Sequence, residues 1–165
     1  MQVIAAPERE AGAWRIAAAL EQMGSPWQAA LMDDLIAHPP VEPEINIPAV
    51  FAEVTAAFER YEQALNENDV AMLDAIFRDA PYTIRFGLAE NLYGSAQIAA
   101  FRSARTPPGI RVISGTVITT FGRDFATAST LFHRGSNGRT GRQMQSWVRF
   151  PEGWRVVAAH VSWMD

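Results

Sequence analysis

A change in the spacing of apolar residues near Tyr82 constrains this sequence more than any other feature does. Before it, apolar residues recur every three or four positions, at Val50, Val54, Phe58, Tyr61 and Leu65. That spacing places them on one face of a long amphipathic helix. After it, apolar and polar residues alternate, which is the period of a half-buried strand. The chain is therefore predicted to form helices first and a sheet second.

The remaining elements follow from capping residues and turns. Asn46 is the predicted cap of the long helix, residues 66–69 break that helix and cap a second over 70–77, and Ser95 caps a third over 95–105. Strands are predicted over residues 82–86, 111–121, 125–134, 143–150 and 154–163, with a tight turn at 136–138. Long strands joined by short turns favour an antiparallel meander, so the helices must cover one face. The predicted fold class is α+β.

A proline-rich stretch near residues 38–44 predicts a boundary between two parts of the chain. Pro39, Pro40 and Pro43 cannot continue a helix and favour an extended linker. Residues 1–44 are predicted to be a helical extension with this linker, with one helix over 8–23 and a weaker one over 26–37. An extension of that size is too small to bury a core of its own, so residues 45–165 are the expected domain.

The amino-acid composition argues against several classes of function. There are no cysteines, so disulfides and thiolate metal sites are excluded. The net charge is −4 and the 14 basic residues, all arginines, form no run, which argues against nucleic acid as a partner. No stretch reaches the roughly 20 apolar residues of a membrane span, and no signal peptide is recognisable. A cytoplasmic protein is expected.

Several short sequence motifs carry a specific resemblance to a known family. They are Ala52–Glu62, Thr83–Gly87, Glu90–Gly94, Thr119–Thr130, Gly141–Gln143 and Trp147–Ser162. Together with the element order, they resemble the AtzH/HpxZ family of the nuclear-transport-factor-two-like, or cystatin-like, superfamily. The resemblance covers nearly all of residues 45–165. It implies a cone-shaped, curved antiparallel sheet covered by three helices.

The resemblance also implies a function in the catabolism of ureide or amide nitrogen, beside an amidase. One branch of the family converts 1,3-dicarboxyurea to allophanate, and another is linked to oxalurate and purine catabolism. A small enzyme without a cofactor is therefore expected, and the alternative is a non-catalytic protein that binds a small anion for a partner amidase. The convex side of such a sheet usually pairs with a second copy, so a homodimer is expected.

The front of the chain has a different resemblance. Residues 2–10 followed by 15–21 resemble the last strand and helix of amidase-signature hydrolases. Amidases of that class are encoded next to members of the small family, which implies a fused or read-through amidase tail. The Ser-cis-Ser-Lys machinery of those hydrolases is absent from the chain, so the tail is expected to have no such activity.

Tyr61 and Arg85 are the first candidates for the site. Arg85 lies in a short strand between Ile84 and Phe86 and faces away from both. If that face is the inner one, its guanidinium needs a carboxylate from the protein or from a ligand. The family's functional tyrosine and arginine match Tyr61 and Arg85. The resemblance thus implies that Arg85 grips a carboxylate and that Tyr61 donates a proton, whereas the structural alternative is a core tyrosine.

Five further residues are candidates of lower rank for binding a substrate: Asn91, Tyr93, Arg105, Gln145 and His160. Asn91 and Tyr93 are expected in a loop that could equally only cap the third helix. Arg105 is preferred over Arg102 as a second carboxylate clamp, the alternative being a solvated helix face. Strand alternation groups His160 with Trp154, Val156, Ala158 and Ser162, near Gln143 and Gln145. His160 is the best general base on offer, since histidine titrates near neutral pH, but a structural histidine is the alternative.

No residue pattern indicates a cofactor. The three histidines show no metal spacing and no acidic residue accompanies them in a ligand pattern. No phosphate-binding loop and no Ser-His-Asp arrangement is recognisable. The sequence therefore predicts that no metal or cofactor takes part.

Overall fold

The computed structural model describes residues 41–135 and 139–164. The chain divides into two units between Glu42 and Pro43, and only the second unit is described below. The helices predicted before residue 38, the resemblance to an amidase tail and the hairpin turn at 136–138 lie outside the described residues, so these remain predictions.

Six strands form one sheet in the order β2-β1-β6-β5-β4-β3. The four long strands are β3 (Arg111–Phe121), β4 (Phe125–Arg134), β5 (Thr140–Phe150) and β6 (Gly153–Trp163), and each pairs antiparallel with the next. The short strands β1 (Ile84–Phe86) and β2 (Asn91–Tyr93) extend the edge, and β1 runs parallel to β6. The meander is confirmed, but residues 91–93, expected in a loop, form a strand.

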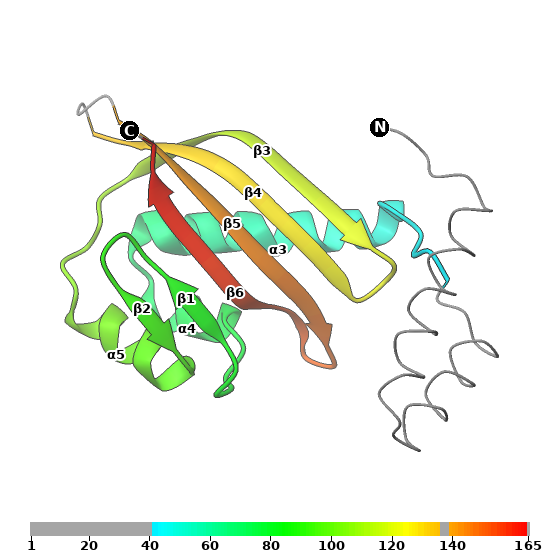
Figure 1. Ribbon diagram of the computed structural model, residues 1–165, viewed down its shortest axis with the longest axis horizontal. Helices are drawn as coiled ribbons and strands as arrows, with labels where there is room; N and C mark the ends of the chain where they lie inside the picture. Colours follow the sequence, from blue (N-terminus) through cyan, green and yellow to red (C-terminus); the bar gives the residue numbers. More distant parts are fainter. Residues whose placement is uncertain (1–40, 136–138, 165) are drawn as a thin grey trace, which may run out of the picture. The chain divides into compact units, whose positions relative to one another are not determined.

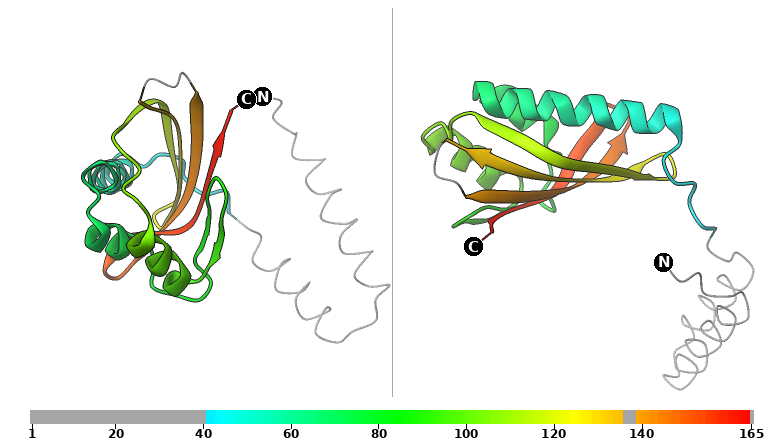
Figure 2. Two further views of the ribbon diagram at one scale, coloured as in Figure 1. Left: turned by 90° about the vertical axis from the view of Figure 1, so that its left-hand side faces the viewer. Right: turned by 90° about the horizontal axis from the view of Figure 1, so that it is seen from above.

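Three helices cover one face of the sheet. The helix α3 (Pro48–Glu67) crosses behind the long strands, while α4 (Val70–Ile76) and α5 (Ser95–Ala104) lie near β1 and β2 (Figure 1). Seen from above, α3 runs along one side of the curved sheet (Figure 2). The five apolar residues predicted on one face of this helix are all buried. They pack with inward residues of the strands into a single core, which includes Trp147, Trp154 and Val156.

Two of the three predicted helix caps are wrong. Asn46 does not cap α3, because its backbone is left-handed (φ 57°) and its side-chain oxygen accepts the amide of Thr120 on β3. Ser95 is the first residue of α5 rather than its cap, and its hydroxyl donates to Asp79. Asp69 does cap α4, since its carboxylate accepts the amide of Met72. Asn46 and Ser95 instead serve contacts between elements that local sequence does not reveal.

Irregularities in two long strands bend the sheet around the helices. The pairing of β3 with β4 shifts between Ser114 and Val117, where Gly115 has a left-handed backbone (φ 59°). The pairing of β5 with β6 shifts at Val157, which has no partner in register. Bulges of this kind bend a strand and increase its twist. They produce the curved sheet whose concave face meets the helices.

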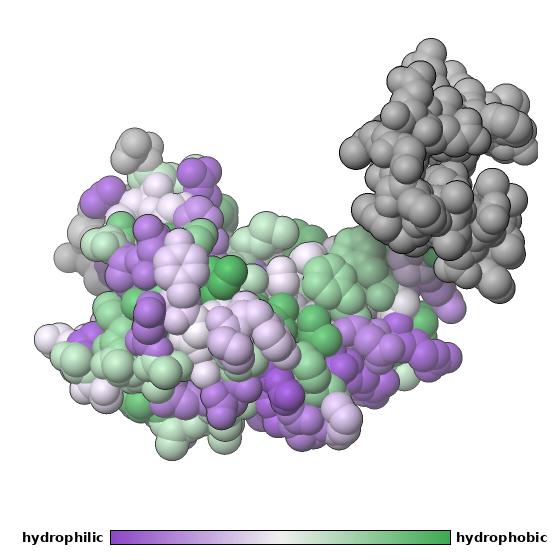
Figure 3. Space-filling view, turned by 60° about the horizontal axis from the view of Figure 1, so that its bottom comes forward, coloured by the Kyte–Doolittle hydropathy of each residue, from purple (hydrophilic) through white to green (hydrophobic). Residues whose placement is uncertain are grey.

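The surface shows no single dominant apolar area on the side drawn in Figure 3. Hydrophobic residues are interspersed there with hydrophilic ones. Within residues 41–135 and 139–164, none of the helices has the length and apolar character needed to cross a membrane.

Candidate functional site

Strand register brings Arg85 and Gln145 onto the concave face of the sheet. Arg85 pairs with Ala159 of β6, and Ala159 pairs in turn with Gln145 of β5. Adjacent strands lie about 4.8 Å apart, so the backbones of Arg85 and Gln145 are separated by roughly 10 Å. Ala159 between them is small and buried. Arg85 therefore points to the inner side of the sheet, which the sequence alone did not decide.

A buried chain of hydrogen bonds connects α3 to this face. Arg111, the first residue of β3, forms a two-pronged ion pair with Glu62 of α3, donating from Nε at 2.9 Å and from Nη2. Its Nη1 donates to the Gln143 Oε1 atom at 3.2 Å. The Tyr61 hydroxyl donates to the same oxygen at 3.1 Å. All four side chains are buried, which makes their relative positions rigid.

The chemistry of these partners fixes the orientation of the Gln143 amide. Arginine can only donate hydrogen bonds, so the atom of Gln143 that faces Arg111 must be the carbonyl oxygen. The Gln143 Nε2 atom then points elsewhere, and it is buried without a hydrogen-bond partner among the described residues. The Tyr61 proton is directed at Gln143, and its lone pairs remain available. The site thus presents an amide donor and a tyrosine oxygen held in place by Arg111.

Arg85 already has a carboxylate partner inside the protein. Its Nη1 atom forms an ion pair with Glu90, and the side chains are only 13% and 21% exposed. The second Glu90 oxygen accepts the amide of Ala89 at 3.2 Å. Gly87 makes room for this arrangement, since a Cβ there would lie 1.8 Å from the Glu90 Oε1 atom. A carboxylate ligand of Arg85 would have to displace Glu90.

Arg105 follows the last residue of α5 and turns toward the same interior. Its guanidinium carbon lies 5.9 Å from the centroid of the Phe101 ring, and that of Arg85 lies 5.1 Å from the same centroid. Its Nε and Nη2 atoms are buried without a hydrogen-bond partner among the described residues. Burial lowers the pKa of Arg105, and the charges of Arg85 and Arg102 lower it further. The surroundings of Arg105 therefore disfavour its charged form.

Two more arginines support the frame of the site. Arg102 donates to the Leu73 carbonyl at 2.8 Å and to Asp74 at 2.6 Å, tying α5 to α4. Arg134 donates to the carbonyls of Pro108 and Gly109 at 2.6 and 2.7 Å, which holds the loop between Arg105 and β3. Burial lowers the pKa of both guanidinium groups.

The balance of charge at this inner polar cluster is positive. We use that name for Tyr61, Arg85, Arg105, Arg111, Gln143 and Gln145. Three nearby arginines have carboxylate partners, namely Arg85 with Glu90, Arg102 with Asp74 and Arg111 with Glu62. Neither Arg105 nor Arg134 has a carboxylate partner among the ion pairs of the described residues. Arg105 within the cluster and Arg134 outside it therefore carry positive charges without a carboxylate among these ion pairs, so the cluster suits an anion.

Gln145 is the most unusual amide of the cluster. It is 1% exposed, and both its Nε2 and its Oε1 atom are buried without a hydrogen-bond partner among residues 41–135 and 139–164. An unpaired buried amide is costly, and proteins rarely keep one without a reason. A ligand that carries both an N–H and a carbonyl group would satisfy both ends.

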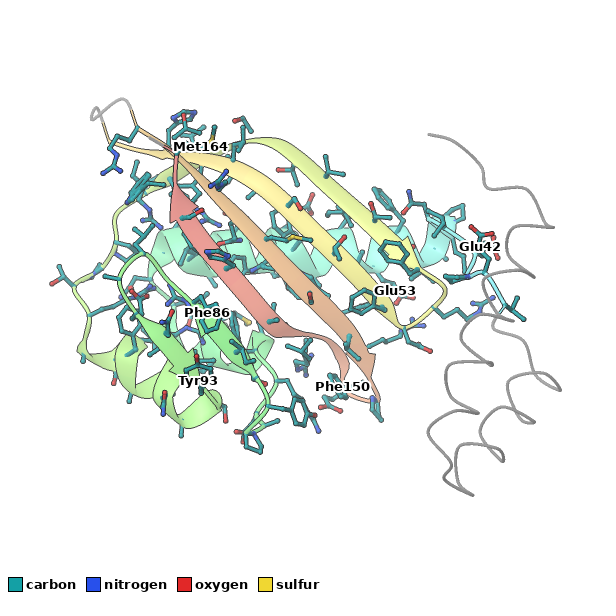
Figure 4. The ribbon with its side chains drawn as sticks, viewed as in Figure 1. Glu42, Glu53, Phe86, Tyr93, Phe150 and Met164 are labelled. Carbon is teal, nitrogen blue, oxygen red and sulfur yellow. The ribbon has the colours of Figure 1, made fainter. Side chains whose placement is uncertain are left out.

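The structure separates three of the candidate residues from the cluster. His160, Asn91 and Tyr93 lie on the convex face, where Phe86 stacks edge-on with Tyr93 at 5.7 Å and with His160 at 6.4 Å. Phe86 and Tyr93 lie side by side on β1 and β2 (Figure 4). The predicted grouping of His160 with Trp154 and Val156 is wrong, because the extra residue Val157 reverses the alternation along β6.

Sequence reasoning missed Arg111 and Glu62 and gave Gln143 no role. A signal was present, since Arg111 begins a strand two residues before Ile113 and therefore shares its inward face. An inward arginine requires a carboxylate, and Glu62 follows Tyr61 on the long helix. Only the pairing of β3 beside α3 shows that these two meet.

A surface hollow between α4 and α5 is separate from the hydrogen-bonded network of Tyr61. Asp74, Asp79, Ser95 and Arg102 line it. Its carboxylates already bind Arg102 and the Ser95 hydroxyl. Among the described residues, no group of three histidine, aspartate or glutamate side chains is placed to hold a metal ion.

The Glu90 ion pair predicts a pH-dependent stability. Burial raises the pKa of the Glu90 carboxyl, but the hydrogen bonds from Arg85 and the Ala89 amide together with the Arg85 charge bring it below the ordinary 4.5. A lowered pKa stabilises the folded state above the ordinary value, and this contribution is lost as the pH falls through the folded-state pKa. Glu90→Gln is therefore expected to lower the free energy of unfolding at neutral pH, and the difference from wild type should shrink as the pH falls below the ordinary value and through the folded-state pKa.

Denaturant unfolding at several pH values measures this difference. Gly87→Ala, which pushes the Glu90 carboxylate away from Arg85, should show the same trend. A difference between wild type and Glu90→Gln that is constant with pH would contradict this assignment.

Comparisons with known proteins place the chain among others of this fold. The family model described as AtzH-like matches residues 43–165. A protein with unknown function of the DUF3225 family from Pectobacterium atrosepticum SCRI1043 is 56% identical, with a TM-score of 0.72, over 73% of this chain and 95% of that one. A cystatin-like fold protein from Burkholderia xenovorans LB400 is 47% identical, with a TM-score of 0.71, over 74% and 97%.

A more distant likeness concerns the fold alone. An NTF2-like protein of unknown function from Pseudomonas putida KT2440 is 21% identical, with a TM-score of 0.58, over 69% of this chain and 86% of that one. No curated protein matches the chain. The expected cystatin-like, nuclear-transport-factor-two-like fold is confirmed.

Proposed function

Because the chain belongs to the AtzH-like family, we propose that it is a small enzyme of ureide or amide nitrogen catabolism. Its substrate is a carboxylated urea, of the kind converted from 1,3-dicarboxyurea to allophanate, or a compound related to oxalurate. The observation that supports this most is the surplus of positive charge around Arg85, Arg105 and Tyr61. A small anion with amide groups matches the charge and the unpaired Gln145 amide.

Arg85 binds a carboxylate of the substrate by exchanging partners. Its ion pair with Glu90 is a local contact, five residues apart, at the more exposed side of the cluster. A ligand carboxylate replaces Glu90 with a two-pronged hydrogen bond, the strongest form of this interaction. Glu90 then turns toward solvent, where its charge is hydrated. The substrate thus enters where Arg85 and Glu90 meet the surface.

Tyr61 supplies the proton that the reaction requires. Loss of carbon dioxide from an N-carboxylate breaks the carbon–nitrogen bond and leaves the electron pair on nitrogen, which must gain a proton. The Tyr61 hydroxyl releases Gln143, gives its proton to this nitrogen and regains one from water. The positive charges of Arg111 and Arg105 stabilise the tyrosinate that forms in between. The step needs no metal or cofactor.

One observation favours a second candidate function. The Tyr61 proton is already engaged with Gln143, and Arg111 holds that amide in place. A tyrosine fixed in this way accepts hydrogen bonds more readily than it gives up a proton. In this alternative the protein binds the anion without converting it and passes it to a partner amidase.

Assembly and location complete the proposal. Exposed apolar residues on the convex face, including Met144, Leu131 and Val117, suit a homodimer formed through the sheet. A partner amidase is proposed from the resemblance of residues 2–21, and a cytoplasmic location from the absence of cysteines. Sedimentation analysis of wild type and Met144→Asp tests the dimer, since a charge at its centre should separate the copies.

Turnover by variants of Tyr61 and Arg85 tests the enzyme. The purified protein is incubated with 1,3-dicarboxyurea or with oxalurate, and carbon dioxide and allophanate are measured. Tyr61→Phe is expected to lower kcat by about 100-fold, the scale of one general acid. Arg85→Gln should mainly raise KM, because it removes the carboxylate clamp.

Arg123→Gln is the matched control, since Arg123 is an exposed arginine in the turn between β3 and β4. It should leave both constants unchanged. Folded Tyr61→Phe and Arg85→Gln proteins with full turnover would contradict the assignment. Tight binding of the substrate by wild type without turnover would favour the carrier function.

A further inference from the structure

Arg105 carries the least explained charge in the described part of the chain. Two of its three nitrogens, Nε and Nη2, are buried without a hydrogen-bond partner among the described residues. A buried guanidinium normally pairs with a carboxylate, because taking the charge out of water is costly. The neighbouring charges of Arg85 and Arg102 increase this cost rather than offset it.

The position of Arg105 is fixed by the surrounding structure. Its backbone amide donates to the Phe101 carbonyl at 3.1 Å and ends α5. The loop that follows is held by Arg134 through the carbonyls of Pro108 and Gly109. These contacts hold the backbone on both sides of Arg105, so little backbone freedom is lost when the side chain binds a partner.

Arg85 lies within reach of the same ligand. Both guanidinium carbons lie near the ring of Phe101, so they cannot be further apart than their two distances from its centroid added together. Arg85 already has Glu90, whereas Arg105 has no carboxylate among the ion pairs of the described residues. Two groups of one small ligand can therefore meet two separate cations.

We propose that Arg105 is a specificity-determining residue that holds a second carboxylate, so that the site selects dicarboxylates over monocarboxylates. This inference rests on the proposed function, in which Arg85 holds the first carboxylate. The Gln145 amide lies on the same concave face and has no hydrogen-bond partner among the described residues. It forms hydrogen bonds with the neutral amide or carbonyl group between the two carboxylates of the ligand. Arg85 alone would bind any small carboxylate, and Arg105 adds the discrimination.

Binding of a matched pair of stable anions tests the proposal by calorimetry at one fixed ionic strength. Glutarate carries two carboxylates separated by three atoms, and butyrate is its monocarboxylate counterpart. Wild type is expected to bind glutarate at least about tenfold tighter than butyrate, the scale of one charge-assisted hydrogen-bonded pair. Arg105→Gln should remove this preference and leave butyrate binding within about twofold of wild type.

Two further variants keep the result interpretable. Arg105→Lys retains the positive charge but lacks the planar guanidinium that can donate two parallel hydrogen bonds. It should keep part of the preference for glutarate over butyrate. Arg123→Gln, an exposed arginine away from the cluster, should keep all of it. Arg105→Gln is expected to fold at least as stably as wild type, since it removes a half-buried charge that has no carboxylate partner among the described ion pairs.

The outcomes separate this inference from the proposed function. A folded Arg105→Gln protein that still prefers glutarate to butyrate to the same extent would overturn the role of Arg105, even if turnover is observed. Failure of wild type to bind either anion would overturn the assignment of both arginines. Butyrate binding that survives Arg85→Gln would overturn the carboxylate clamp of the proposed function, while the glutarate preference would still report on Arg105.

Discussion

Replacing Arg111 with methionine is expected to lower the free energy of unfolding by about 3–5 kcal/mol, because it leaves Glu62 buried without its partner. Glu62 is 8% exposed and Arg111 is 3% exposed, so water cannot take over the lost contacts without rearrangement. Arg111 also donates to Gln143 and lies over the Phe132 ring, 4.9 Å from its centroid. Urea or guanidinium unfolding followed by circular dichroism measures the change.

A double variant shows whether the loss comes from the unpaired charge. In Arg111→Met with Glu62→Leu, neither charge of this pair is left, and replacing both partners of a buried pair by apolar groups is often close to neutral. The double variant should therefore regain most of the lost stability. If it is as unstable as Arg111→Met alone, packing of the arginine rather than its charge is what matters. A change below about 1 kcal/mol in the single variant would contradict the description of a buried pair.

The second large effect is expected at Gly141, where alanine should cost about 3 kcal/mol, the upper end for overpacking a core. Gly141 pairs directly with Phe132 across β5 and β4. A Cβ at Gly141 would lie 2.1 Å from the Phe132 ring. That ring is 1% exposed and is held between Arg111 and Trp163, so it has no free space to enter.

Two companion variants identify the steric origin of this effect. Phe132→Leu combined with Gly141→Ala should be more stable than expected from the sum of the single changes, because the shorter side chain makes room for the methyl group. Gly122→Ala is the contrasting case, since the new methyl group would lie 3.8 Å from the Pro43 Cβ atom and only the left-handed backbone (φ 64°) is strained. It should cost about 1–2 kcal/mol. Additive losses at Gly141 and Phe132 would contradict a clash between them.

Much of the fold follows from local patterns. The face of α3 is visible in the spacing of Val50, Val54 and Phe58, because helix geometry alone brings residues three and four apart together. The long strands follow from alternation, and their ends agree with the structure to within three residues. The strand over residues 91–93 was missed, because three residues are too few to show a period.

The site was only partly predictable. Alternation showed that Arg85 faces away from Ile84 and Phe86, but not which of the two faces is buried. Pairing with Ala159 decides this, and β6 lies more than 70 residues further along the chain. The sequence has no feature that separates Arg105 from Arg102 as a carboxylate clamp. The structure distinguishes them, since Arg102 has Asp74 and Arg105 has no carboxylate among the described ion pairs.

The sequence by itself determined the order of helices and strands, the buried face of α3 and the resemblance that its motifs carry. The tertiary structure alone decided which polar side chains meet. One extra residue in β6, Val157, turns His160 outward and Ala159 inward, and the meeting of β3 with α3 joins Arg111 to Glu62. The physical reason is that local spacing sets the facing of side chains only relative to their neighbours. Pairing between distant strands, with its bulges, then decides which face becomes the interior.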